Sequence, residues 1–223
     1  MGGYTYPKCE TCWQEQALKE KEEEVRLNLE LRRQGRRQKA ERLRAKIEKV
    51  LPPLFAKAHL RDLSAALRGR MVTLPAGKGL YLWGSAGAGK SHAMAALMRR
   101  YILSGLSVRR IQWGMLTLEL RDTFGQGGTE FLALKPYFES DILLLEDVGT
   151  TVSIDVRETD FVLRTLLLLL DERLENCRVT FVTSNKSPEQ LGRSFDSRVE
   201  SRLYACCEIQ SVASADKRRS KKV

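Results

Sequence analysis

Long apolar runs and a signal peptide are both missing from this sequence. No run approaches the roughly 20 apolar residues that a membrane-spanning helix needs, and the nearest candidate, TLLLLLDERL, is soon interrupted by charge. The cysteines number five and are unevenly spread, which argues against a disulfide framework and for the reducing cytoplasm. No internal repeat is visible. These absences argue against a membrane protein and against a small disulfide-stabilised secreted protein.

Basic residues outnumber acidic ones, which gives the 223-residue chain a net charge of +10 and an isoelectric point near 9.5. This balance is compatible with an acidic partner or with a solvated basic surface. The length suits one domain of ordinary size with an appendage. Shifts in composition divide the chain into a helical arm (1–50), a linker that docks on the core (51–78), the core (79–212) and a basic disordered tail (213–223).

The arm begins with a C-x-x-C pair, Cys9 and Cys12, which has the spacing of half a zinc site. Structural zinc takes four ligands, and no second local pair follows. Either distant residues or another subunit complete a Zn²⁺ site, or the two residues are free thiols.

The rest of the arm, from Glu10 to Val50, is rich in charged helix formers and contains no proline. This composition predicts one long helix, unbroken or interrupted near Gly35, that ends before Pro52. Its apolar positions do not sustain a heptad, which argues against a dimeric coiled coil. The helix is either simply solvated or an arm that binds a partner or DNA.

The stretch GLYLWGSAGAGKSHAM (79–94) contains an apolar strand, a glycine loop and a helix start in that order. It fits G-x-x-x-x-G-K-[ST] in the flanking context that this motif requires. The backbone N–H groups of such a loop form a nest for phosphate at the helix N-terminus. We expect Lys90 to contact the β- and γ-phosphates of ATP and the Ser91 hydroxyl to ligate Mg²⁺; the alternative is a strand-to-helix turn without a ligand. The predicted nucleotide-binding residues are Gly84, Ser85, Ala86, Gly87, Ala88, Gly89, Lys90, Ser91 and His92.

Strand and helix patterns alternate after the loop, which predicts an α/β fold with a parallel sheet covered on both faces. DILLLED (141–147) has the continuous apolar run of a strand buried on both faces. Further strands are predicted at 108–113, 178–185 and 205–212, and helices at 115–124, 131–140, 157–176 and within 187–203.

Two adjacent carboxylates, Glu146 and Asp147, end the apolar run. Mg²⁺ prefers oxygen ligands, so one carboxylate near the Ser91 hydroxyl is enough to hold it. Most enzymes of this kind have Asp before Glu, and here the order is reversed. Adjacent strand residues point to opposite sides, so we assign Glu146 to the metal and Asp147 to the attacking water. Because Asp147 is one methylene shorter than glutamate, slow hydrolysis is expected.

Two further features are candidates for contacts with phosphate. Asn185 ends the predicted strand at 178–185, where its amide could hydrogen-bond the γ-phosphate or the attacking water. Arg198 and Arg202 lie four residues apart on one face of a short helix. Their spacing alone fits a pair of surface salt bridges, whereas an arginine supplied by a neighbouring subunit can stabilise phosphoryl transfer.

Taken together, these motifs resemble the DnaC/IstB-type branch of AAA+ ATPases, which includes bacterial and phage helicase loaders and transposon ATPase subunits. The likeness covers roughly residues 52–212. It depends on GSAGAGKSHAMAAL, on LRDTFGQGGTEFLALKPYFESDILLLEDVG, on FVTSN and on DSRVESRL, and the double-proline linker before LFAKAHL adds to it.

The resemblance implies a P-loop AAA+ fold of the ASCE type, with a five-stranded parallel sheet in the order 5-1-4-3-2, helices on both faces and no C-terminal lid. It also implies self-association into a ring or spiral, with ATP bound between subunits. Asn185 would be the sensor residue and Arg202 the arginine finger, with Arg198 nearby. The region 114–140 would contribute to binding single-stranded DNA, together with the basic residues in or beside it: Arg109, Arg110, Arg121 and Lys135.

Three functions remain open from the sequence. The favoured one is a cytoplasmic helicase loader, in which the arm binds the replicative hexameric helicase and ATP binding with slow hydrolysis controls assembly on single-stranded DNA. The second is an IstB-like ATPase that regulates a transposase on duplex DNA, or a stand-alone regulatory DNA-binding ATPase. The third is an adaptor that binds nucleotide without turning it over.

Overall fold

A computed structural model describes residues 10–125, 129–149 and 160–212 of the chain. The chain forms two compact units, Met1–Ala45 and Lys46–Val223. Helix α1 (Glu10–Val50) supplies the described part of the first unit and continues unbroken through Gly35. Five apolar residues of that helix are exposed to solvent, with exposed fractions between 49% and 59%: Leu18, Val25, Leu27, Leu29 and Leu31.

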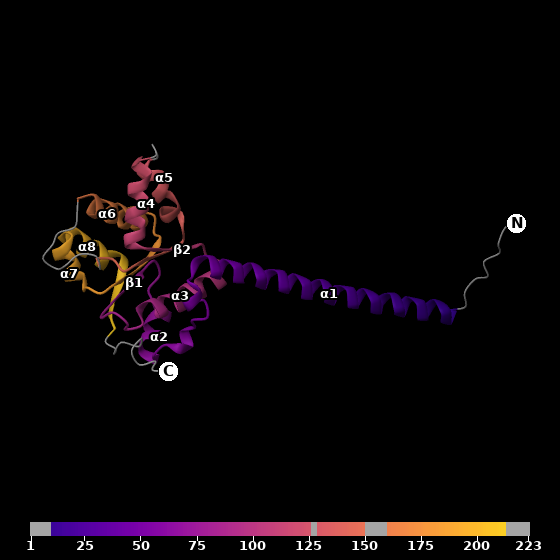
Figure 1. Ribbon diagram of the computed structural model, residues 1–223. Helices are drawn as coiled ribbons and strands as arrows, with labels where there is room; N and C mark the ends of the chain where they lie inside the picture. The colour runs from indigo at the N-terminus through magenta and orange to yellow at the C-terminus, as the bar shows by residue number, and fades with distance from the viewer. Residues whose placement is uncertain (1–9, 126–128, 150–159, 213–223) are drawn as a thin grey trace. The chain divides into compact units, whose positions relative to one another are not determined.

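The second unit, drawn in Figure 1, is built on five parallel strands in the order β2-β3-β4-β1-β5. Read from the other edge, this is the predicted order 5-1-4-3-2, so the predicted topology is confirmed. The strands are β1 (Gly79–Trp83), β2 (Val108–Gln112), β3 (Ile142–Glu146), β4 (Val179–Ser184) and β5 (Cys207–Ser211). The helices are α2 (Ala65–Val72), α3 (Lys90–Leu103), α4 (Trp113–Gly125), α5 (Glu130–Glu139), α6 (Asp160–Glu175), α7 (Pro188–Ser194) and α8 (Ser197–Cys206), with short 3-10 turns η1 (Pro53–Phe55) and η2 (Leu60–Asp62).

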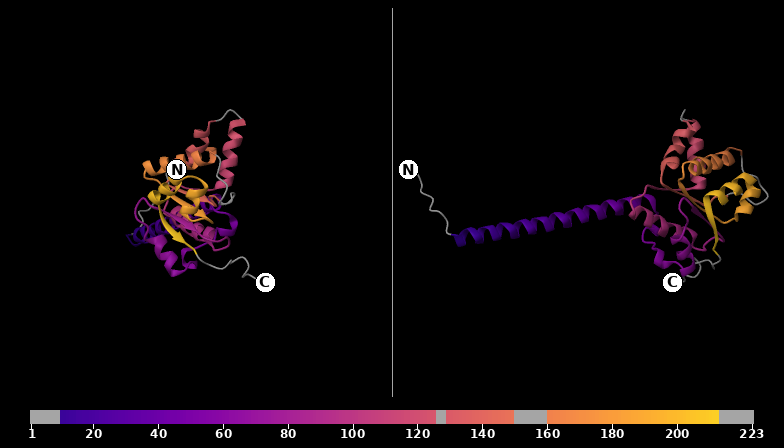
Figure 2. Two further views of the ribbon diagram at one scale, coloured as in Figure 1. Left: turned by 90° about the vertical axis from the view of Figure 1, so that its left-hand side faces the viewer. Right: turned by 180° about the vertical axis from the view of Figure 1, so that it is seen from behind.

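Helices cover both faces of the sheet, as the alternation of patterns predicted (Figure 2). Successive strand residues face opposite sides: Tyr81 packs in the cluster with α4 to α8, whereas Leu80 and Leu82 pack with α2 and α3. The strand DILLLED is buried on both faces, as expected from its continuous apolar run.

The structure differs from the predicted elements in several places: α2 was not predicted, and Ala205 and Cys206, predicted to begin the last strand, end α8. Trp113, predicted as the end of a strand, instead begins α4, and its indole is buried in the cluster around α4 to α8. The region 187–203 forms two helices, because Ser187 caps α7 through Gln190 and Asp196 starts α8 by accepting from the Arg198 N–H. The predicted basic tail lies outside the described residues.

An arginine with no exposed surface, Arg173 on α6, connects three elements of this unit. Its guanidinium donates to the carbonyl oxygens of Phe138, Ser140 and Val179 at 3.2, 2.8 and 2.7 Å, and its Nε donates to the Thr180 hydroxyl at 2.9 Å. Burial lowers its pKa to about 10, which still leaves it charged near neutral pH. Arg173 therefore satisfies backbone acceptors at the end of α5 and the start of β4.

None of the helices in the described ranges is long and apolar enough to cross a membrane.

Candidate nucleotide site

The glycine loop lies between β1 and α3, in the strand–loop–helix arrangement that the motif requires. Gly84 has a φ of +146° and Gly89, the N-cap of α3, has a φ of +95°, a range that other residues rarely adopt. At Gly84 a Cβ atom would lie 2.3 Å from the carbonyl oxygen of Val212, so no side chain fits there. The remaining loop residues, Ser85 to Ala88, are thereby placed before the N-terminus of a 14-residue helix, where an anion is stabilised.

Lys90 and Asn185 meet at this loop although 95 residues separate them. The ammonium group of Lys90 donates to the carbonyl oxygens of Gly84 and Ser85 at 2.8 and 2.9 Å, and to Oδ1 of Asn185 at 2.7 Å. Asn185 follows β4, whose Ser184 pairs with Trp83 of β1. The sheet order thus brings together two residues that the sequence assigned to phosphate.

Glu146 ends β3 on the face covered by α3 and is only 2% exposed. The Ser91 side chain lies close enough to this carboxylate to lower its pKa. Burial raises the pKa of Glu146, against the lowering effects of Arg110 and Ser91. A serine hydroxyl near a carboxylate beside the phosphate loop fits the oxygen ligands that Mg²⁺ prefers. Ser91 and Glu146 would hold the ion, which would neutralise charge on the phosphates.

Asp147 does not continue the strand, so the argument from alternating strand residues does not apply to it. Its φ is +57°, and its N–H donates to the Thr183 hydroxyl at 3.1 Å. Aspartate adopts this left-handed conformation more readily than most residues that have a side chain. The backbone of Asp147, rather than strand alternation, sets its direction relative to Glu146.

Arg110 is a site residue that the sequence reasoning missed. Its guanidinium forms an ion pair with the Glu146 carboxylate. The sequence grouped Arg110 with Arg109 as DNA contacts, but neighbouring strand residues face opposite sides of the sheet. The alternation of strand residues could have separated Arg110 from Arg109. Pairing Arg110 with Glu146 also required knowing that β2 lies next to β3.

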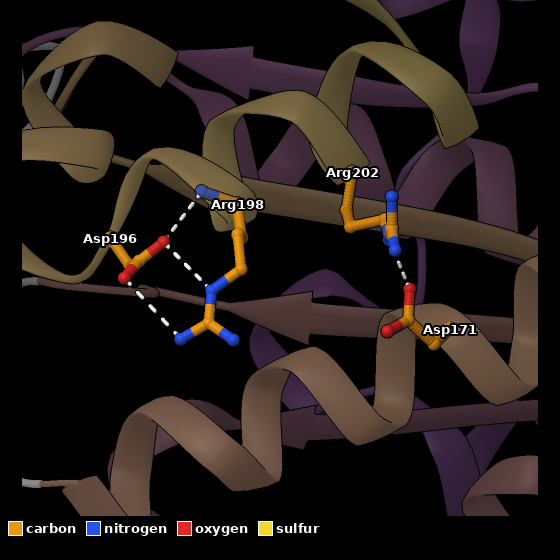
Figure 3. Close-up of polar contacts among 4 residues, drawn as sticks. All are labelled: Asp171, Asp196, Arg198 and Arg202. Atoms are coloured by element: carbon orange, nitrogen blue, oxygen red, sulfur yellow. Dashed lines mark hydrogen bonds and ion pairs between the residues drawn. The ribbon is translucent and has the colours of Figure 1, made fainter.

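Arg198 and Arg202 both lie on α8 with partners in their own chain (Figure 3). Arg198 bonds Asp196 through its backbone N–H and through its Nε, at 2.8 and 3.0 Å. Arg202 forms an ion pair with Asp171 of α6, and its side chain is 44% exposed. Buried Val199 and Leu203 fix the rotation of the helix, so both arginines lie on its outer side, as the spacing predicted.

One other predicted site residue, His92, points away from the phosphate loop. His92 Nε2 is 3.9 Å from Asp62 Oδ2, and its ring contacts Phe55 at a centroid distance of 6.2 Å, so it faces the 3-10 turns. Cys9 lies outside the described residues, and the side chain of Cys12 is also outside them. Within the part of the chain that is described, no cluster of three or more His, Cys, Asp or Glu side chains could hold a metal ion.

Comparisons with known proteins agree with this geometry. A family model described as "IstB-like ATP binding protein" matches residues 17–222. The crystal structure of the DnaC helicase loader superposes with a TM-score of 0.60 at 21% identity, covering 72% of this chain and 99% of that one. DnaI gives a TM-score of 0.61 at 22% identity, with 73% and 95% covered.

The replication initiator DnaA bound to AMPPCP and single-stranded DNA gives a TM-score of 0.61 at 17% identity, with 75% of this chain and 52% of that chain covered. No curated protein matches the sequence significantly. Sequence identities this low establish only the fold. The family model spans nearly the whole chain, so it establishes the family. The chain therefore belongs to the IstB-like ATP-binding protein family and is a P-loop ATPase with the AAA+ fold that it shares with DnaC and DnaI.

Proposed function

We propose that this ATPase is a helicase loader that assembles on single-stranded DNA. The observation that carries the proposal is Phe131, an aromatic residue on α5 whose side chain is 60% exposed. Bases stack on an exposed aromatic ring only where they are unpaired, so such a ring favours single strands over duplex.

A basic residue lies one helical turn from Phe131, beside a cavity that a second basic residue also lines. Lys135 follows Phe131 by one helical turn on α5, and it lines a cavity of about 360 Å³ together with Arg109 of β2 and Leu132. Arg109 is exposed, and it lies on the face of the sheet opposite the one that α3 covers. Cations beside a stacking ring match the two requirements of single-strand binding, which are phosphate neutralisation and base stacking. Tyr137 is a poorer stacking candidate, because its hydroxyl donates to Glu119 at 3.2 Å and its ring is half-buried.

Replacing Phe131 by alanine is expected to weaken binding of single-stranded oligonucleotides about tenfold, the loss of one stacked base. Duplex binding at the same salt concentration should change little, because paired bases do not reach the ring. Fluorescence anisotropy with labelled oligonucleotides measures both affinities. Phe131→Trp keeps an aromatic face and should retain single-strand affinity. Equal losses for single strands and duplex would contradict the stacking role.

In this proposal α1 supplies the contact with the replicative hexameric helicase. Its exposed apolar side chains, which lie among charged residues, would be available for contact with a partner. ATP between subunits, completed by Arg202 of a neighbour, would control assembly into a ring or spiral.

Slow hydrolysis would suit such a switch, and Asp147 tests this idea. Asp147→Glu is expected to raise steady-state ATP turnover roughly tenfold, because the longer side chain reaches further toward the attacking water. The same change should lower the free energy of unfolding by about 1 kcal/mol, since glutamate is less suited to the left-handed backbone.

Asp147→Asn is the matched control for this prediction, because asparagine tolerates the same backbone but cannot accept a proton. Its turnover should fall about a hundredfold without loss of stability. Turnover that stayed level or fell in Asp147→Glu would refute the assignment of Asp147 to the water.

The family match favours a second candidate, an ATPase subunit that regulates a transposase on duplex DNA. The full chain should be tested for capture of a purified hexameric helicase and, separately, of a transposase, with and without ATP. Capture of the helicase together with preference for single strands supports the loader. Capture of the transposase together with preference for duplex supports the second candidate.

A further inference from the structure

We propose that Arg110 competes with Mg²⁺ for the Glu146 carboxylate, so that the ATP site contains its own displaceable cation. The inference rests on the proposed assignment of Glu146 as the metal ligand, and it does not depend on the loader function.

The register of β2 and β3 places Arg110 where it can reach this carboxylate. Arg110 pairs with Leu144, and Gln112 pairs with Glu146. Arg110 and Glu146 therefore point to the same face of the sheet, two positions apart on adjacent strands. This is the face that α3 covers, with Ser91 in its first turn.

The ion pair lies in a poorly solvated place. The side chain of Glu146 is 3% exposed and that of Arg110 is 19% exposed. A carboxylate at this depth needs a compensating charge, because an unpaired buried charge is strongly destabilising. Arg110 supplies that charge when no metal is bound.

Mg²⁺ would take its ligand from the same carboxylate. The guanidinium of Arg110 forms an ion pair with Oε2 of Glu146, and the Ser91 side chain lies near the same carboxylate. An ion bound between Ser91 and Glu146 would lie beside the paired guanidinium of Arg110, and the two cations would repel each other at short range. Binding of the metal therefore requires Arg110 to leave the carboxylate. The free energy needed to break the ion pair weakens the binding of Mg²⁺ by the same amount.

A different role for Arg110 would have the opposite consequence. If the guanidinium served only to orient Glu146 for the metal, its removal would weaken Mg²⁺ binding. The sign of the change in Mg²⁺ requirement therefore separates competition from positioning.

The experiment measures the Mg²⁺ concentration that gives half-maximal binding of a fluorescent ATP analogue to the full chain, without DNA. Arg110→Gln removes the charge and should lower that concentration about tenfold, the size of a charge-assisted hydrogen bond. Arg100→Gln is the matched control, because it makes the same charge change at an exposed position on α3. It should leave the Mg²⁺ requirement unaltered.

Three further measurements make the result decisive. Arg110→Lys keeps the charge with fewer donors, so its Mg²⁺ requirement should lie between those of the wild type and Arg110→Gln, and it serves if the glutamine variant does not fold. Thermal unfolding should show Arg110→Gln less stable than the wild type without metal, with a larger gain when Mg²⁺ and nucleotide are added. Glu146→Gln should raise the Mg²⁺ requirement.

An unchanged or raised Mg²⁺ requirement in Arg110→Gln overturns the competition. If Glu146→Gln leaves the requirement unchanged, the assignment of the metal ligand fails instead, and the competition falls with it. The two failures are therefore distinguishable.

Discussion

Replacing Arg202 by alanine is expected to slow ATP turnover about a thousandfold in the assembled protein, the lower end of what an arginine finger contributes. Affinity for the nucleotide should change far less, because the guanidinium would act on the charge that develops during phosphoryl transfer. Single-turnover hydrolysis under assembly conditions, alongside an equilibrium binding assay, measures the two effects separately.

The surroundings of Arg202 fit a residue that leaves its own chain's contact to serve a neighbour. Asp171 holds it in a half-exposed ion pair, and such pairs contribute only about 0–1 kcal/mol. Release toward a phosphate on another subunit therefore costs little. Arg198, one turn earlier on α8, is the matched control, and Arg198→Ala should lose far less activity.

Mixing variants tests whether Arg202 acts in trans. Lys90→Ala subunits should fail to hold ATP but still present Arg202, whereas Arg202→Ala subunits hold ATP but lack the finger. A mixture should therefore recover turnover that neither variant has alone. Failure to recover, in a mixture shown to co-assemble, would place Arg202 outside the neighbour's site.

The second large effect is on stability: Arg173→Met is expected to lower the free energy of unfolding by about 3 kcal/mol or more. The methionine fills much of the volume but leaves the carbonyl oxygens of Phe138, Ser140 and Val179 without the donors that Arg173 provides. These acceptors lie where α5 ends and β4 begins, so the loss should loosen the contact between those elements. Urea unfolding followed by circular dichroism gives the difference.

Arg178 supplies the control for this prediction. It also donates to the Phe138 carbonyl, at 2.6 Å, but it is only partly buried. Arg178→Met should therefore cost about 1 kcal/mol, the value of one ordinary hydrogen bond. A loss of similar size in both variants would mean that the buried position of Arg173 has no special weight.

Local sequence signals were sufficient for the parts of the site that lie within one strand–loop–helix unit. The spacing of Gly84, Gly89, Lys90 and Ser91 predicted the loop, and the apolar run before Glu146 predicted the central strand. In each case the backbone geometry follows from neighbouring residues, so no long-range contact is needed to infer it. The strand order, by contrast, came from the family resemblance, because several orders of parallel strands satisfy the same hydrophobic pattern.

Contacts between distant segments were beyond the reach of the sequence. It assigned Arg109 and Arg110 to one DNA surface, and the register of β2 against β3 sent them to opposite faces of the sheet, with Arg110 on Glu146. It also did not distinguish Arg173 from the other charged residues of α6, because burial depends on what α5 and β4 place around it. By itself the sequence determined that the protein is basic, that it has a phosphate-binding loop and that an acidic residue ends a buried strand. The loop and the acid follow from the spacing of residues close together in the chain. Only the tertiary structure decided which cation meets that acid, because strand pairing, rather than proximity in sequence, sets the partner of a buried charge.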